Sequence, residues 1–81
     1  MNILDRINKL KKNYQLFSSE HNFIGGIEFW MRDIVRGSFV EQNLNLAEAY
    51  IDCYENTKNS DQNIVNSLRE IIEEEYQLIR K

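Results

Sequence analysis

The chain has 81 residues and a net charge of −3, with 42% hydrophobic and 28% charged residues. This length bounds it to a single domain, residues 1–81, with a modest core, and it argues against a deep substrate cavity. The single cysteine, Cys53, excludes an internal disulfide, and no Cys/His cluster has metal-ligand spacing. No apolar run approaches the roughly 20 residues of a membrane helix, and no signal peptide is visible. We therefore expect a cytoplasmic protein without metal, cofactor or membrane association.

The hydrophobic pattern predicts an all-α fold, because proline is absent and apolar residues recur at steps of three and four. The first predicted helix runs from Asn2 to Phe17, with Asn2 and Asp5 as its capping start. Its apolar stripe contains Ile3, Ile7, Leu10, Tyr14 and Phe17, and its other face holds Lys9, Lys11 and Lys12, which we expect in solvent.

The second predicted helix runs from Phe23 to Arg36, with Ser19 or Asn22 as its amino-terminal cap. Gly37 is well placed to end it in a left-handed conformation. A hairpin over FIGGIEF, turning at Gly25 and Gly26, is an alternative. Two strands of three residues with nothing to pair against would be marginal, so we favour the helix.

The third predicted helix begins at Ser38, where Glu41 completes a capping box, and ends near Asn56. A later start at Asn45, with Glu48 as the second member of a capping box, is an alternative. The last helix begins at Ser60 or Asp61 and reaches almost to Lys81. The sequence thus predicts a compact bundle of four helices, with a core that includes Ile27, Trp30, Ile34, Tyr50, Ile51, Leu68 and Ile72.

The residues available for catalysis are few, and none forms a recognisable catalytic pattern. His21 lies in a predicted loop or cap, which indicates a surface or capping role. Cys53 has no basic neighbour in sequence that would lower its pKa, and we expect it to be a small buried residue. The Gly25–Gly26 pair matches no phosphate-binding motif. We therefore expect a protein without enzymatic activity.

Phe29 is the one large apolar residue that leaves the predicted core stripe of the second helix. It projects to the opposite side, among Arg32, Asp33 and Arg36, over the turn that contains the two adjacent glycines. Either another helix covers it, which we favour, or it is an exposed aromatic anchor for a partner.

The third helix carries the clearest candidate binding surface. Glu41, Asn45, Glu48, Asp52 and Glu55 follow one another at steps of four, three, four and three, so they project to one side. No lysine or arginine occurs between Gly37 and Thr57. On the last helix, where Glu70, Glu73, Glu74 and Glu75 follow, Arg69 can pair with Glu73. The simplest interpretation is a solvated face; the functional one is a surface for a basic partner.

The distribution of charge along the chain favours a protein partner over nucleic acid. Residues 1–36 carry a net charge of +2 and residues 37–81 carry −5. Affinity for phosphate needs clustered lysine and arginine, and the basic residues of the first helix are too few. We therefore predict that Glu41, Glu48, Asp52 and Glu55 bind a basic protein, with Phe29 as a separate apolar anchor. The alternative is a structural or regulatory subunit that self-associates through apolar surface around Phe29, Tyr54 and the glycine pair.

In overall character the chain resembles the small acidic helical immunity proteins that bacteria encode beside secreted toxins. The resemblance rests on the helical pattern of the whole chain and on the acidic stretch EQNLNLAEAYIDCYEN. It implies a cytosolic antidote that occludes or distorts the active site of a cognate toxin, such as a nuclease.

Overall fold

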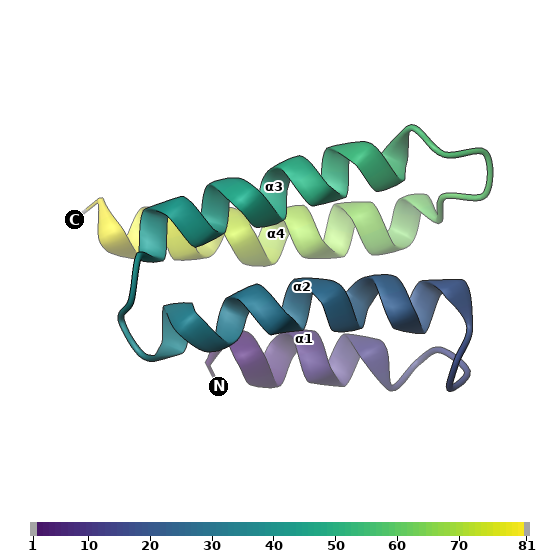
Figure 1. Cartoon of the computed structure of the whole chain (residues 1–81), viewed down its shortest axis with the longest axis horizontal. Helices are drawn as coiled ribbons and strands as arrows, with labels where there is room; N and C mark the ends of the chain where they lie inside the picture. The colour runs from purple at the N-terminus through teal and green to yellow at the C-terminus, as the bar shows by residue number, and fades with distance from the viewer. Residues whose placement is uncertain (1, 81) are drawn as a thin grey trace.

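The computed structural model describes residues 2–80, and every regular element within them is an α-helix. The chain folds into a four-helix bundle whose antiparallel helices each pack on the next, with α1 also packed on α4 (Figure 1). The α2–α3 connection and both chain ends lie at one end of the bundle, and the other two connections lie at the opposite end. The predicted all-α fold is confirmed. The helices are α1 (Ile3–Lys11), α2 (Ser19–Val35), α3 (Val40–Glu55) and α4 (Gln62–Ile79).

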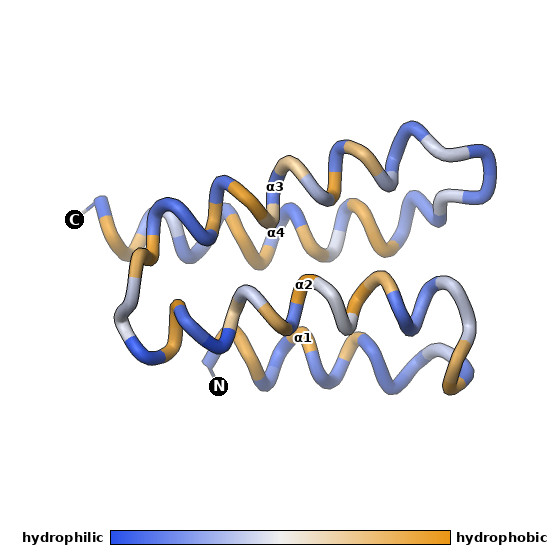
Figure 2. The backbone as a smooth tube through the Cα atoms, in the orientation of Figure 1, coloured by the Kyte–Doolittle hydropathy of each residue, from blue (hydrophilic) through white to orange (hydrophobic). Residues whose placement is uncertain are grey.

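The core forms where the apolar stripes of the helices meet, and these stripes alternate with polar residues along each helix (Figure 2). Of the seven predicted core residues, Trp30 and Tyr50 are only partly buried. They lie at the boundary between α2 and α3, where their rings contact each other edge to face with centroids 5.0 Å apart. The other five are buried as predicted: Ile27, Ile34, Ile51, Leu68 and Ile72.

No helix within residues 2–80 combines the length and apolarity that a membrane crossing requires.

Three of the predicted helix boundaries are confirmed by the backbone. The side chain of Asn2 accepts a hydrogen bond from the amide of Asp5 at 2.8 Å, and Asp61 caps α4 by accepting from the amide of Asn63 at 2.9 Å. Gly37 has a φ of +79°, and the amides after the end of α2 donate back into its last turn. This left-handed turn stops α2 and reverses the chain into α3.

The predicted limits of α1 and α2 are wrong around residues 12–22. The helix α1 ends at Lys11, and α2 already begins at Ser19, because Ser18 caps it by accepting from the amide of His21 at 3.1 Å. Residues 12–17, which the apolar stripe placed in the first helix, therefore form the connection between α1 and α2. Phe17 consequently lies in this turn with a φ of +67° and a side chain that is 83% exposed.

The predicted capping of α3 by Ser38 is also wrong, as is the alternative start at Asn45. The N-cap residue is Phe39, which has a φ of +47° and makes no side-chain capping bond. Instead, the side-chain amide of Asn43 donates to the carbonyl of Ser38 at 3.1 Å. The tight turn after Gly37 thus sets the start of α3, and the side chain of Phe39 is left 73% exposed.

An ion pair that the sequence did not indicate joins α1 to the middle of α2. The ammonium of Lys11 lies 2.8 Å from Glu28 Oε1, and their side chains are only 20% and 11% exposed. The prediction that Lys11 is simply solvated is therefore wrong. Because a carboxylate needs a cation or hydrogen-bond donors when it leaves water, Lys11 allows Glu28 to be buried.

A ladder of four aromatic rings holds α2 against α3. The ring of Phe23 stacks between Tyr54, at a centroid distance of 3.9 Å, and Tyr50, at 5.1 Å, and Tyr50 meets Trp30 edge to face. Gly26 makes room for this ladder, because a Cβ at its position would lie 3.1 Å from the Tyr50 hydroxyl. Both glycines therefore lie inside α2 and not in a hairpin turn, and Gly26 alone is needed for helix packing, since a Cβ at Gly25 would meet nothing within 4 Å.

Candidate functional site

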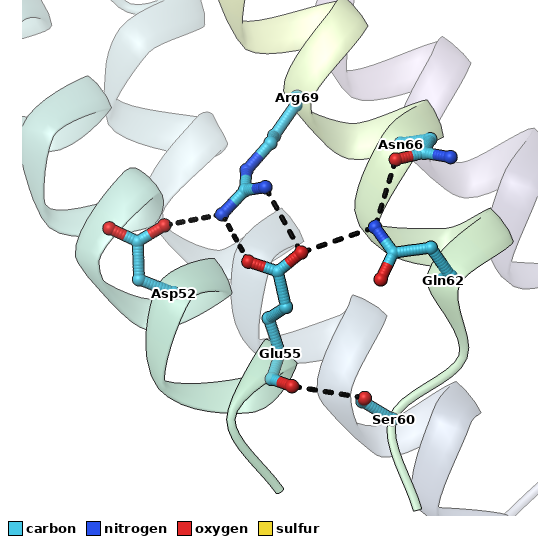
Figure 3. Close-up of polar contacts among 6 residues, drawn as sticks. All are labelled: Asp52, Glu55, Ser60, Gln62, Asn66 and Arg69. Carbon is cyan, nitrogen blue, oxygen red and sulfur yellow. Dashed lines mark hydrogen bonds and ion pairs between the residues drawn. The ribbon is translucent and has the colours of Figure 1, made fainter.

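The predicted acidic residues of α3 do lie along one side of the helix, but an arginine of α4 pairs with two of the four. Arg69 donates from Nη2 to Asp52 at 2.6 Å, and it holds Glu55 with two contacts at 2.8 and 3.2 Å (Figure 3). Gln62 adds a hydrogen bond to the Glu55 carboxylate at 3.1 Å. The predicted pairing of Arg69 with Glu73 is therefore wrong, because the arginine reaches across to α3 instead.

The contacts with Arg69 and Gln62 hold the pKa of Glu55 below its usual range. A carboxyl group whose pKa is lower in the folded than in the unfolded protein adds stability above the unfolded pKa, about 4.3 for glutamate. That stability is lost as the pH falls through the lower, folded value. The bridge therefore contributes at neutral pH and disappears in acid.

We expect the variant Arg69→Met to lose less stability than the wild type between pH 6 and pH 3. Urea unfolding followed by Trp30 fluorescence across this range would measure the difference. Lys58→Met, at an exposed loop position without a recorded ion pair in residues 2–80, is the control and should keep the wild-type slope. An unchanged acid sensitivity of Arg69→Met would show that the bridge does not stabilise the fold.

The other two acidic residues of the predicted surface, Glu41 and Glu48, are exposed and form no ion pair within residues 2–80. Glu48 borders a groove of about 360 Å³ between α3 and α4. Ile51 and Ile72 form its apolar floor, and its other lining residues are Arg69, Glu70, Glu73 and Tyr76. Because Arg69 is already bonded to Asp52 and Glu55, the rim of the groove presents mainly negative charge.

Tyr76 closes one part of this groove and links α4 to α3. Its hydroxyl donates to the side-chain oxygen of Asn45, the one uncharged member of the predicted ridge. Burial and the nearby acceptor and charge of Glu48 raise the pKa of Tyr76 to about 12. The Tyr76 hydroxyl has a single proton, so it can donate to Asn45 or to Glu48 but not to both at once. In the structure it donates to Asn45. Asn45 is exposed, and this bond also makes it a structural contact between α3 and α4.

The fold gathers the negative charge of the chain on one half of the bundle. The helices α3 and α4 contain eight carboxylates and one arginine, whereas α1 and α2 contain four carboxylates and four cations. One of those eight, Glu74, is paired with Arg6 of α1. We call the exposed carboxylates Glu41, Glu48, Glu70 and Glu73 the acidic face. All four carboxylates were named from the sequence, while the groove that brings Glu48 beside Glu70 and Glu73 follows only from helix packing.

The remaining predicted residues lie elsewhere. Phe29 is 66% exposed on α2, so the interpretation that another helix covers it is wrong. The expectation that Cys53 is buried is wrong. Its side chain is exposed because it faces the open groove between α2 and α3. His21 lies in the first turn of α2 and is partly buried.

Among the residues that the structure describes, no three His, Cys, Asp or Glu side chains gather as a metal site would require. Comparisons with protein families, with characterised proteins and with solved structures returned no match.

Proposed function

We propose that this protein is a non-catalytic binding module that inhibits a basic toxin or nucleic-acid-processing enzyme by docking the acidic face on it. The observation that supports this is the uncompensated charge of α3 and α4. The single arginine of these helices is held by Asp52 and Glu55, which leaves Glu41, Glu48, Glu70 and Glu73 without a cation in the described residues. Nearby carboxylates repel one another, so a partner that supplies lysine or arginine relieves that repulsion.

The roles of the four predicted residues divide accordingly. Glu41 and Glu48 are free to meet a partner, whereas Asp52 and Glu55 position Arg69 and contribute to long-range attraction. Complementary charge of this kind mainly accelerates association and is screened by salt. Reversing Asp52 would therefore disturb the fold as well as the surface, and it is a poor test of binding.

A cleaner test compares two double variants that have the same net charge. Glu48→Gln with Glu73→Gln removes two negative charges from the acidic face. Asn8→Lys with Gln15→Lys instead adds two positive charges at exposed positions of α1 and of the α1–α2 connection. The partner would be captured from a lysate of the source cells, purified and assayed for nuclease activity. We expect the first variant to slow its association by roughly tenfold at low salt and much less at high salt. The control should stay close to wild type.

Equal slowing by both variants would mean that only net charge matters, and unchanged kinetics in the first variant would mean that the acidic face is merely solvated. Failure of the wild-type protein to reduce the partner's activity would contradict the inhibitor role.

A further inference from the structure

The four helices form two hairpins, α1 with α2 and α3 with α4, which residues 36–39 connect (Figure 1). Of the ion pairs recorded within residues 2–80, only Arg6–Glu74 joins one hairpin to the other. The buried surface that the hairpins share is the apolar core with the aromatic ladder. Each hairpin therefore satisfies most of its own ion pairs and presents an apolar surface that fits any copy of the other hairpin.

The connection of residues 36–39, which we call the hinge, contains two residues in the left-handed conformation. Gly37 has a φ of +79° and Phe39 has a φ of +47°. Glycine adopts this conformation readily, but a residue with a Cβ does so only at a cost in free energy. The side chain of Phe39 does not offset that cost, because it makes no capping bond and is 73% exposed. The hinge is therefore strained in the closed bundle.

Opening the hinge into a helix preserves the backbone hydrogen bonds that close α2. In the closed bundle the amide of Gly37 donates to the carbonyl of Ile34 at 2.9 Å. The amide of Ser38 donates to the carbonyl of Asp33, also at 2.9 Å. In a continuous α-helix each amide donates to the fourth residue before it, so the same two amides bond the same two carbonyls in exchange. The sequence has no proline to interrupt a helix over residues 19–55.

We propose that the hinge opens and that two copies of the chain exchange hairpins, which gives a domain-swapped dimer. The α1–α2 hairpin of each copy then packs on the α3–α4 hairpin of the second copy, with the contacts that it makes in the closed bundle. The hinge favours the dimer, because opening releases its strain, whereas the entropy of association favours the monomer in dilute solution. Protein concentration and hinge sequence therefore set the balance.

The end of the bundle that carries the hinge is apolar, and the exchange covers it. The hinge and the end of α4 both lie there (Figure 1), with four exposed side chains: Val35, Phe39, Leu78 and Ile79. In the swapped dimer a hinge of four helical residues, about 6 Å long, joins the two bundles, so this end of one faces the same end of the other. Charges of both signs lie near it, namely Arg36, Arg80, Asp33 and Glu41, so like-charge repulsion alone does not decide the contact.

The acidic face is retained in the dimer and occurs twice. The bonds of Arg69 to Asp52 and Glu55, and that of Tyr76 to Asn45, all lie within the α3–α4 hairpin, which the exchange leaves intact. The dimer does not depend on the proposed function, and Glu48→Gln with Glu73→Gln should leave the dimerisation constant unchanged.

Two substitutions in the hinge should move the equilibrium in opposite directions. Gly37→Ala should strengthen the dimer by about tenfold or more, because alanine is strained at this φ, is the best helix former, and occurs in both hinges of the dimer. A Cβ at Gly37 would meet nothing within 4 Å, so the variant adds no clash. Phe39→Gly should weaken the dimer, since glycine fits the left-handed turn and disfavours the helix. Sedimentation equilibrium of the full chain measures both effects.

Each hinge variant has a matched control. Gly25→Ala also adds a Cβ that meets nothing within 4 Å, but Gly25 lies inside α2, which is helical in both forms. Phe17→Gly relieves the same kind of strain, at a φ of +67°, in the α1–α2 connection, which stays closed in both forms. Neither control should change the dimerisation constant. Equal effects of a hinge variant and its control would overturn the proposal, as would a Gly37→Ala chain that stays monomeric at every concentration.

A distance within one chain distinguishes exchanged hairpins from two closed bundles side by side. Ser19 and Cys53 line the same groove in the closed bundle, whereas they lie roughly 50 Å apart along the single helix of the open chain. Ser19→Cys would be spin-labelled together with Cys53, the single cysteine, and diluted with unlabelled chain so that electron–electron resonance measures only the distance within a chain. We expect the long distance in the dimer and the short one in the monomer. A dimer with only the short distance would contradict the exchange.

Discussion

Replacing Phe23 by alanine is expected to lower the free energy of unfolding by about 3 to 5 kcal/mol, the usual cost of truncating a buried phenylalanine. Phe23 is only 6% exposed and stacks on both Tyr50 and Tyr54, so the variant removes the centre of the ladder that joins α2 to α3. Urea unfolding followed by far-UV circular dichroism would measure the loss. Because a domain of this size has only modest stability, partial unfolding at room temperature is an expected outcome.

Phe29→Ala is the matched control for this experiment, since it removes the same side chain from the same helix at a 66% exposed position. It should change the stability of the monomer by no more than about 0.5 kcal/mol. Comparable losses in the two variants would contradict the assignment of Phe23 to the core and of Phe29 to the surface.

Replacing Lys11 by methionine is expected to destabilise the protein by about 2 to 3 kcal/mol. The methionine fills much of the same space, so the main effect is to leave the nearly buried carboxylate of Glu28 without its cation. The double variant Lys11→Met with Glu28→Leu should recover most of the loss, because two apolar side chains can replace a buried ion pair. Thermal and urea unfolding of the three proteins would measure both effects.

Lys9→Met is the control for the loss of a positive charge from α1, because Lys9 is exposed and forms no ion pair within residues 2–80. It should lie within about 0.5 kcal/mol of the wild type. If Lys11→Met were equally mild, the Lys11–Glu28 pair would add nothing to the fold.

The helix limits around residues 12–22 and at Ser38 differ from the predicted ones for one physical reason, which is that several local signals compete for the same residues. The apolar stripe of the first helix extends to Phe17, yet Ser18 caps the next helix and forces the chain to turn before it. Ser38 and Glu41 match a capping box, yet the left-handed Gly37 already sets the geometry of the turn. Each signal was genuine on its own, and the packing of α1 on α2 and of α2 on α3 decided between them.

In the candidate site, too, the local pattern was predictable and the contacts between helices were not. The spacing of Glu41, Glu48, Asp52 and Glu55 determined that they share one side of a helix, because helical periodicity is a local property. Their electrostatic state was not local. Arg69, fourteen positions beyond Glu55 in the sequence, pairs with two of them, and no pattern within α3 could indicate that.

The sequence alone was enough for the helical period, the left-handed stop at Gly37, the cap at Asn2, a last cap at Ser60 or Asp61, and the predicted isoleucine and leucine positions of the core. These depend on backbone geometry and on side chains within a turn or two of one another. The tertiary structure alone decided which charges are paired, that Glu28 is buried against Lys11, and that Phe29 is exposed. Those outcomes depend on which helix lies alongside which, and contacts between residues distant in the sequence are made only when the whole bundle closes around its core.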